Sequence, residues 1–149
     1  RENPGTMAAI MGLETAEGEK MAKSVGNLIM ARDLLQTYNP DAIRAYLLEH
    51  HYRTSWEYDE AVLKQAADRV ERYAAASRAD AVAGGNPLDG VSYRERFVAA
   101  MDDDLDTPAA LTIMDELSDA ILATTGVRDL VAAQGTLREM AGVMGFRLD

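Results

Sequence analysis

The sequence predicts an all-α fold, in which a helical bundle of about four main helices follows a shorter helical segment. Three observations favour this fold class. Apolar residues recur every three or four positions over long stretches, as they do on the buried face of an amphipathic helix. Short polar connectors that contain glycine or proline separate these stretches. No two segments alternate between apolar and polar residues as a pair of half-buried strands would.

Two short helices are expected ahead of the bundle. An apolar stripe at helical spacing runs through residues 28–35. Asn39 is suited to cap a helix and Pro40 to occupy its first position, so a second short helix should cover residues 40–51. Residues 1–27 show no sustained periodicity, and we expect them to be the tail of another unit.

Four longer helices should form the bundle. The first runs from about Asp59 to about Ala79. After the glycine- and proline-containing connector 84–90, Ser92 and Glu95 stand at the spacing of a capping box, which predicts the start of the second. A glycine separates the last two, whose expected core residues are Leu111, Met114, Leu117, Ile121, Leu130, Leu137, Met140 and Met144.

Composition limits the classes of function. The 149 residues are 48% hydrophobic and 27% charged, as in a soluble globular domain, and no run approaches the roughly 20 apolar residues of a membrane span. With 25 acidic residues against 15 basic ones, the net charge of −10 disfavours broad binding to a polyanion, so any nucleic-acid contact should be local. The absence of cysteine excludes a disulfide framework and a thiolate zinc site.

Two groupings that could suggest a metal lack the necessary spacing. His50 and His51 are adjacent, so on a helix they point about 100° apart and cannot chelate one ion. The acidic run 102–106 lacks the glycine and the terminal glutamate of an EF-hand. We expect no metal site in this chain, and a solvated turn at 102–106 in which Asp106 or Thr107 caps the next helix.

The stretch GEKMAKSVGN, residues 18–27, combines positive charge with flexibility. Lys20 and Lys23 lie between glycines that let main-chain N–H groups approach an anion, and lysine is a mobile point charge suited to phosphate. The order of residues is not that of a Walker loop. This pattern alone leaves both an ordinary solvated loop and a phosphate-contacting loop open.

The same stretch resembles the KMSKS loop of class I aminoacyl-tRNA synthetases, through Lys20, Met21, Lys23 and Ser24. Two later segments, DLLQTYNPDAIRAYLLEHHYRTSWEYDEAVLKQA and FVAAMDDDLDTPAAL, are similar to those that follow this loop in cysteinyl-tRNA synthetases. The resemblance implies that these four residues form an ATP-binding loop in which the two lysines stabilise the triphosphate and Met21 packs. Ala22 replaces a serine of the family, which removes one hydroxyl donor and leaves the cationic function intact.

The resemblance also divides the chain into three parts. Residues 1–27 would be the tail of a catalytic domain with the KMSKS-type loop, residues 28–58 stem-contact-like helices, and residues 59–149 a helical bundle of the tRNA- or anticodon-binding type. The chain has no HIGH-type sequence, no parallel-sheet pattern and no zinc-ligand cysteines. We therefore expect this chain alone not to be catalytic, and zinc only in a catalytic domain that it does not include.

The implied function is that of a C-terminal part of a cytoplasmic cysteine-tRNA ligase, which activates cysteine with ATP and transfers it to tRNA. Arg53 and Trp56 are candidate tRNA contacts, because arginine can grip the backbone and an aromatic ring can stack on a base. The alternative is that Trp56 and Tyr58 fasten the junction between the helical parts. Because the fragment is acidic, its own tRNA binding should be weak.

Two other functions stay open. The related ligase that joins cysteine to an amino sugar in mycothiol synthesis is similar through this region. The acidic charge favours such a small acceptor over tRNA. The lack of an anticodon-reading segment after VMGFRLD also favours it, but only if the sequence is not a piece of a longer chain. The other possibility is a non-catalytic helical module that descends from a synthetase and acts only in binding.

Overall fold

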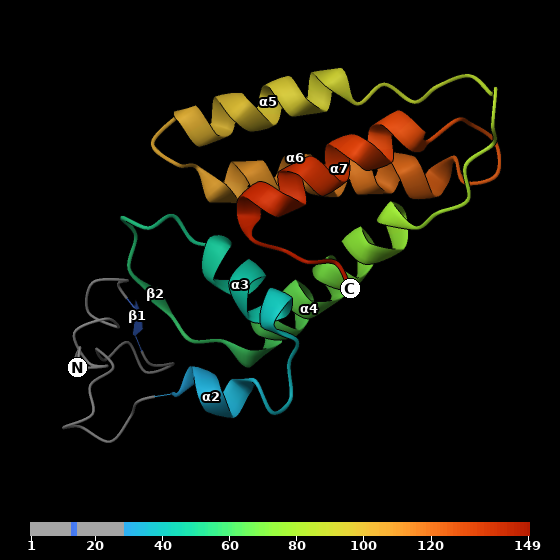
Figure 1. Ribbon diagram of the computed structural model, residues 1–149. Coiled ribbons are helices and arrows are strands. Elements are labelled where there is room, and N and C mark those ends of the chain that lie inside the picture. The colour runs from blue at the N-terminus through green and yellow to red at the C-terminus, as the bar shows by residue number, and fades with distance from the viewer. Residues whose placement is uncertain (1–12, 15–28) are drawn as a thin grey trace.

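The all-α prediction is confirmed by a computed structural model, which describes residues 13–14 and 29–149 (Figure 1). Each helix that was expected within this part of the chain is present, although the first is only one turn long. The helices are α2 (Ala31–Leu34), α3 (Pro40–Leu48), α4 (Glu60–Ser77), α5 (Val91–Asp102), α6 (Thr107–Ala123) and α7 (Val131–Met144). None of these described helices combines the length and the apolar character that crossing a bilayer requires.

Two very short strands accompany the helices. Strand β1 (Leu13–Glu14) pairs in parallel with β2 (Trp56–Glu57), and Leu13 stands opposite Trp56. The sequence did not predict this pair, because strands of two residues are too short to show alternation. The pairing fixes the segment between α3 and α4 to a part of the chain more than forty residues earlier.

Helix α6 lies at the centre of the bundle and contacts α3, α4, α5 and α7. Figure 1 shows α5, α6 and α7 side by side, with α3 and α4 packed below them. The buried residues of α6 recur at helical spacing, and removing this apolar stripe from water supplies the main driving force for packing. All eight expected core residues are buried, together with Leu63, Tyr73, Phe97 and Phe146.

Side-chain caps set the start of three helices. Asn39 accepts a hydrogen bond from the backbone N–H of Asp41 at 2.8 Å, as predicted for α3. Asp59 caps α4 through Ala61 N at 2.8 Å, and Asp106 caps α6 through Ala109 N at 3.0 Å. Each cap satisfies a backbone donor that the first helical turn leaves free.

Helix α5 begins differently from the expectation. The capping-box prediction is wrong, because the helix starts at Val91 and Ser92 is already inside it. Asp89 accepts from Val91 N at 2.9 Å instead. The residue between them is Gly90, where an added Cβ would lie 2.5 Å from the Thr136 hydroxyl oxygen, so the close approach of α7 requires a glycine here.

Arg69 of α4 joins α3, α4 and α6. Its Nη1 lies 2.7 Å from Glu49 Oε1 at the end of α3, and its Nε lies 3.2 Å from Asp115 Oδ1 on α6. The Tyr73 hydroxyl donates to the same Asp115 oxygen at 2.6 Å. These charged side chains are 15–23% exposed, so this network holds three helices together in a partly dehydrated environment.

Candidate functional site

Four of the six predicted site residues, Lys20, Met21, Lys23 and Ser24, lie outside the residues that the structure describes. The other two, Arg53 and Trp56, lie on the segment between α3 and α4. Within the described part of the chain, no hydrogen bond or ring contact joins Arg53 to Trp56, and the two have different surroundings.

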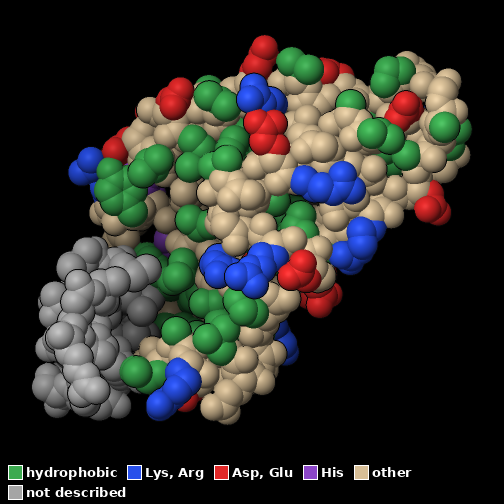
Figure 2. Space-filling model, viewed as in Figure 1, with side chains coloured by type: hydrophobic (Ala, Val, Ile, Leu, Met, Phe, Trp, Pro, Cys, Tyr) green, Lys and Arg blue, Asp and Glu red, His purple; other side chains and the backbone are tan. Residues whose placement is uncertain are grey.

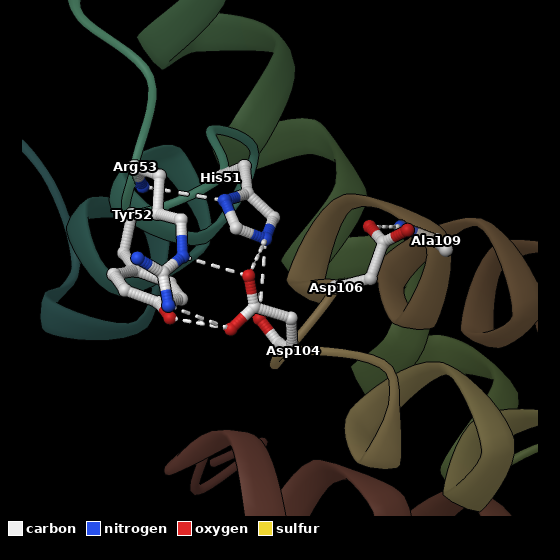
Figure 3. Close-up of polar contacts among 6 residues, drawn as sticks. All are labelled: His51, Tyr52, Arg53, Asp104, Asp106 and Ala109. Carbon is white, nitrogen blue, oxygen red and sulfur yellow. Dashed lines mark hydrogen bonds and ion pairs between the residues drawn. The ribbon is translucent and has the colours of Figure 1, made fainter.

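Arg53 is held by Asp104, in the turn between α5 and α6 (Figure 3). Its Nε donates to Asp104 Oδ2 at 2.7 Å and its Nη2 to Oδ1 at 3.2 Å. The Tyr52 hydroxyl donates to Oδ1 at 2.6 Å, and His51 Nε2 lies 3.1 Å from the Asp104 carbonyl oxygen. We call His51, Tyr52, Arg53 and Asp104 the Asp104 clasp, because it joins two connecting segments across the surface.

The clasp holds a strained turn. Asp104 and Leu105 have φ angles of 52° and 55°, in the left-handed region that costs side-chain-bearing residues about 1–3 kcal/mol each. Residues 102–105 are exposed, as expected of a solvated turn, and the half-exposed Asp104 carboxylate also accepts from three donors. Two residues later Asp106 caps α6, as Figure 3 shows, and this part of the expectation is confirmed.

The clasp also presents an aromatic ring and a guanidinium group at the surface. The Tyr52 ring stacks on His51 with centroids 4.8 Å apart, and the Arg53 guanidinium carbon lies 4.9 Å from the Tyr52 ring centroid. Arg53 and Tyr52 are both exposed. Stacked aromatic and guanidinium planes of this kind can receive an unpaired base, although Asp104 offsets the charge of Arg53.

Hydrogen bonds from Arg53, and then from Tyr52, lower the pKa of Asp104 from 3.8 to about 2. A depressed carboxyl pKa stabilises the clasp above the unfolded value, and this contribution is lost as the pH falls from about 4 to about 2. We predict that Arg53→Gln raises the Asp104 pKa towards 3.8, as measured by NMR titration of its carboxyl carbon. Tyr52→Phe should give a smaller rise, and an unchanged pKa in Arg53→Gln would contradict the clasp.

Trp56 packs at the junction between α3 and α4. Its ring stacks on His50 with centroids 3.9 Å apart, and it meets the Tyr46 ring edge-on at 5.1 Å. Tyr46 is buried, which raises the pKa of its hydroxyl to about 12, and its oxygen accepts from Asp59 N at 2.7 Å. This partly buried arrangement supports the fastening role for Trp56 and Tyr58, which both pack against the core.

A cavity of about 500 Å³ lies beside the clasp. His50 and Trp56 form its aromatic wall, while Tyr52 and Leu105 connect it to the clasp. In the described residues, no three His, Cys, Asp or Glu side chains converge as a metal site requires. This region can therefore offer stacking, apolar contact and hydrogen bonds to a partner.

Sequence reasoning missed Asp104 and Tyr52 as parts of one arrangement. Their hydrogen bond joins residues 52 positions apart, and no local pattern reports such a pairing. The acidic run that contains Asp104 is visible in the sequence, but the residue of the run that has a distant partner becomes evident only in the fold.

Two family models match the chain in order. Residues 10–68 match the tRNA synthetases class I (C) catalytic domain, and residues 96–149 match the DALR domain. The chain is also 38% identical over 139 residues to the cysteine-tRNA ligase of Sodalis glossinidius, which covers 91% of this chain. The chain belongs to the cysteine-tRNA ligase family of class I tRNA synthetases.

Other members of the family show the same relationship. The cysteine-tRNA ligase of Chlorobium chlorochromatii is 40% identical over 80% of this chain, and that of Pseudomonas aeruginosa strain PAO1 is 35% identical over 90%. The chain spans only about 25–30% of the length of these ligases. The first family match contains the KMSKS-type loop and the clasp residues 51–53, and the second contains Asp104.

Proposed function

We propose that this chain is a C-terminal part of a ligase that activates cysteine with ATP and transfers it to tRNA(Cys). The observation that carries the proposal is the identity of 35–40% to cysteine-tRNA ligases along 80–91% of the chain, with both family matches in order. The full-length protein, called the parent below, would supply the rest of the catalytic domain and act in the cytoplasm. The chain alone would not be catalytic.

The proposed division of labour follows the three parts of the sequence. Residues 1–27 would carry the KMSKS-type loop, residues 28–58 would form the stem-contact-like segment, and residues 59–149 would be the bundle that approaches tRNA. The chain contains no cysteine, so the thiolate ligands of a zinc ion would have to come from another part of the parent. We assign no step to such an ion.

The lysines of the loop would act on the phosphates of ATP. When the cysteine carboxylate attacks the α-phosphorus, negative charge moves onto the phosphate oxygens and the pyrophosphate leaving group. Ammonium groups positioned at those oxygens favour the transition state over the ground state. Lys20 and Lys23 would have this role, with Met21 and Ser24 completing the nucleotide-binding loop.

The Asp104 clasp would form part of the tRNA-facing surface. Arg53 would offer its exposed face to the RNA backbone while Asp104 fixes its direction, and Tyr52 would offer a ring for stacking. Trp56 would stabilise this surface by stacking on His50, which precedes the clasp residues in the chain. The net charge of −10 means that the fragment alone should bind tRNA weakly.

The acceptor distinguishes this proposal from the amino-sugar ligase. We expect the parent, given ATP and radiolabelled cysteine, to transfer cysteine to a tRNA(Cys) transcript and not to an amino-sugar acceptor. An alanine-specific tRNA is the matched control, and it should remain uncharged. Transfer to the amino sugar without tRNA charging would replace the proposal with its alternative, and tRNA binding without any cysteine activation would favour the binding module.

A further inference from the structure

The arginines of the described residues differ in their partners. Seven form ion pairs with carboxylates, namely Arg32, Arg44, Arg53, Arg69, Arg72, Arg94 and Arg96. Arg128 is half-buried and donates to two backbone carbonyl oxygens. Within the same part of the chain, Arg78, Arg138 and Arg147 are exposed and form no ion pair. Their positive charges are therefore not offset by a bound carboxylate, in a protein whose net charge is −10.

The three exposed, unpaired arginines belong to segments that come together, namely the end of α4, helix α7 and the C-terminal segment. Arg138 of α7 donates to the Ser77 carbonyl oxygen at the end of α4. Arg78, the next residue after Ser77, donates through Nη1 to the Leu148 carbonyl oxygen at 3.1 Å, and Arg147 precedes Leu148. We call Arg78, Arg138 and Arg147 the arginine strip.

The backbone under the strip is fixed by buried polar groups. Asp41 of α3 is 3% exposed, and its Oδ2 accepts from the backbone N–H groups of Arg147 at 2.7 Å and Leu148 at 3.1 Å. Gln134 of α7 donates to the carbonyl oxygens of Ala76 at 3.1 Å and Ala79 at 2.7 Å. The strip therefore stands on a preorganised surface, which lowers the entropy cost of binding.

The three residues of the strip are exposed. Figure 2 shows basic side chains over the region where α7, the end of α4 and the C-terminal segment lie in Figure 1, with acidic side chains beside some of them. A cavity of about 250 Å³ beside Arg147 is lined by Arg44, by Asp41, which pairs with Arg44, and by Asp149. The positive charge of the strip is therefore confined to its three arginines, and a local contact of this kind is what the acidic composition permits.

We propose that the arginine strip binds phosphates of the RNA backbone, and this inference rests on the proposed transfer of cysteine to tRNA. A carbonyl acceptor orients a guanidinium without cancelling its charge, and the remaining N–H donors can grip a phosphate in a bidentate way. Arg138 uses one N–H group to cap the end of α4 at the Ser77 carbonyl oxygen. Arg78 uses one N–H group to bind the Leu148 carbonyl oxygen in the C-terminal segment. The Arg147 side chain has no hydrogen-bond partner among the described residues, so all of its N–H groups can bind a phosphate.

The test compares the strip with another pair of exposed arginines. In the parent, we expect Arg147→Gln to raise the KM for tRNA(Cys) about 3-fold. The double variant Arg138→Gln/Arg147→Gln should raise it about 10-fold. Cysteine-dependent pyrophosphate exchange without tRNA should remain unchanged. The slope of log binding constant against log salt should fall by roughly 0.7–0.9 for each arginine removed. The matched control, Arg94→Gln/Arg96→Gln, removes arginines that are paired with Glu139 and Glu116 and should leave both values unchanged.

Different outcomes separate this inference from the proposed function. Equal increases in the KM for tRNA in the strip and control variants would overturn the proposed role of the strip, because they would show that only the overall charge of the protein matters. If the parent activates cysteine but does not bind tRNA, the proposed role of the strip is wrong, whereas the proposed cysteine activation is supported. The parent could instead bind tRNA without activating cysteine. If Arg147→Gln weakened that binding, the result would support phosphate binding by the strip and reject the proposed ligase function. Circular dichroism melting of each variant verifies that it is folded.

Discussion

Replacing Lys20 or Lys23 with alanine in the parent is expected to lower the rate of cysteine-dependent pyrophosphate exchange about 100- to 1,000-fold, because each removes a donor to charge that develops in the transition state. The KM for cysteine should change little, since the lysines would contact ATP and not the amino acid. The measurement is steady-state exchange over a range of ATP and cysteine concentrations.

The chain offers a matched control for this prediction. Its three lysines are Lys20, Lys23 and Lys64, and the last is exposed on α4. Lys64→Ala should leave exchange unchanged, and Ala22→Ser, which restores the usual hydroxyl of the loop, should alter the rate by only a few-fold. An exchange rate that survives in the Lys20→Ala/Lys23→Ala variant would show that the loop does not have the role its resemblance implies.

Replacing Arg69 with methionine is expected to reduce the free energy of unfolding by about 2–3 kcal/mol, because it leaves Glu49 and Asp115 close together without their shared cation. This figure is below that of a fully buried pair, since water still reaches both carboxylates. Chemical denaturation of the fragment or the parent measures the loss. Arg72→Met is the control, because Arg72 pairs with Asp119 at a more exposed position and should cost much less.

The loss in Arg69→Met should also depend on pH. Burial already raises the pKa of Glu49, and Arg69 opposes this rise. Without Arg69 the folded-state pKa of Glu49 should rise further above its unfolded value, so protonation stabilises the folded variant as the pH falls. The deficit relative to the wild type should therefore be smaller at pH 5 than at pH 8, and a loss equal to that of Arg72→Met at both pH values would contradict the network.

Local signals made most of the fold predictable. Asn39 with Pro40 marked the start of α3, and the periodicity of α4, α6 and α7 indicated which of their residues are buried. Caps and amphipathic stripes act over one or two turns, so they are visible in a short window of sequence. The start of α5 was misplaced because Asp89 and Ser92 are both residue types that can cap a helix, and it is Asp89 that accepts from Val91 N.

The candidate site was less predictable. The KMSKS-type loop is a contiguous motif whose role stays a prediction, whereas the clasp depends on a turn that brings Asp104 to Arg53. The arginine strip likewise joins residues from α4, α7 and the C-terminal segment, and its distinguishing property is which arginines have carboxylate partners. Side-chain pairing of this kind depends on the whole fold and is not encoded in a local pattern.

We propose that the chain belongs to a ligase whose first reaction is cysteine activation. The most direct test of this proposal is pyrophosphate exchange by the parent with ATP and each of cysteine, serine and alanine in turn, in the absence of tRNA. We expect exchange that depends on cysteine and exceeds that with serine or alanine by several orders of magnitude. Absence of cysteine-dependent exchange in a folded, ATP-binding parent would contradict the proposal.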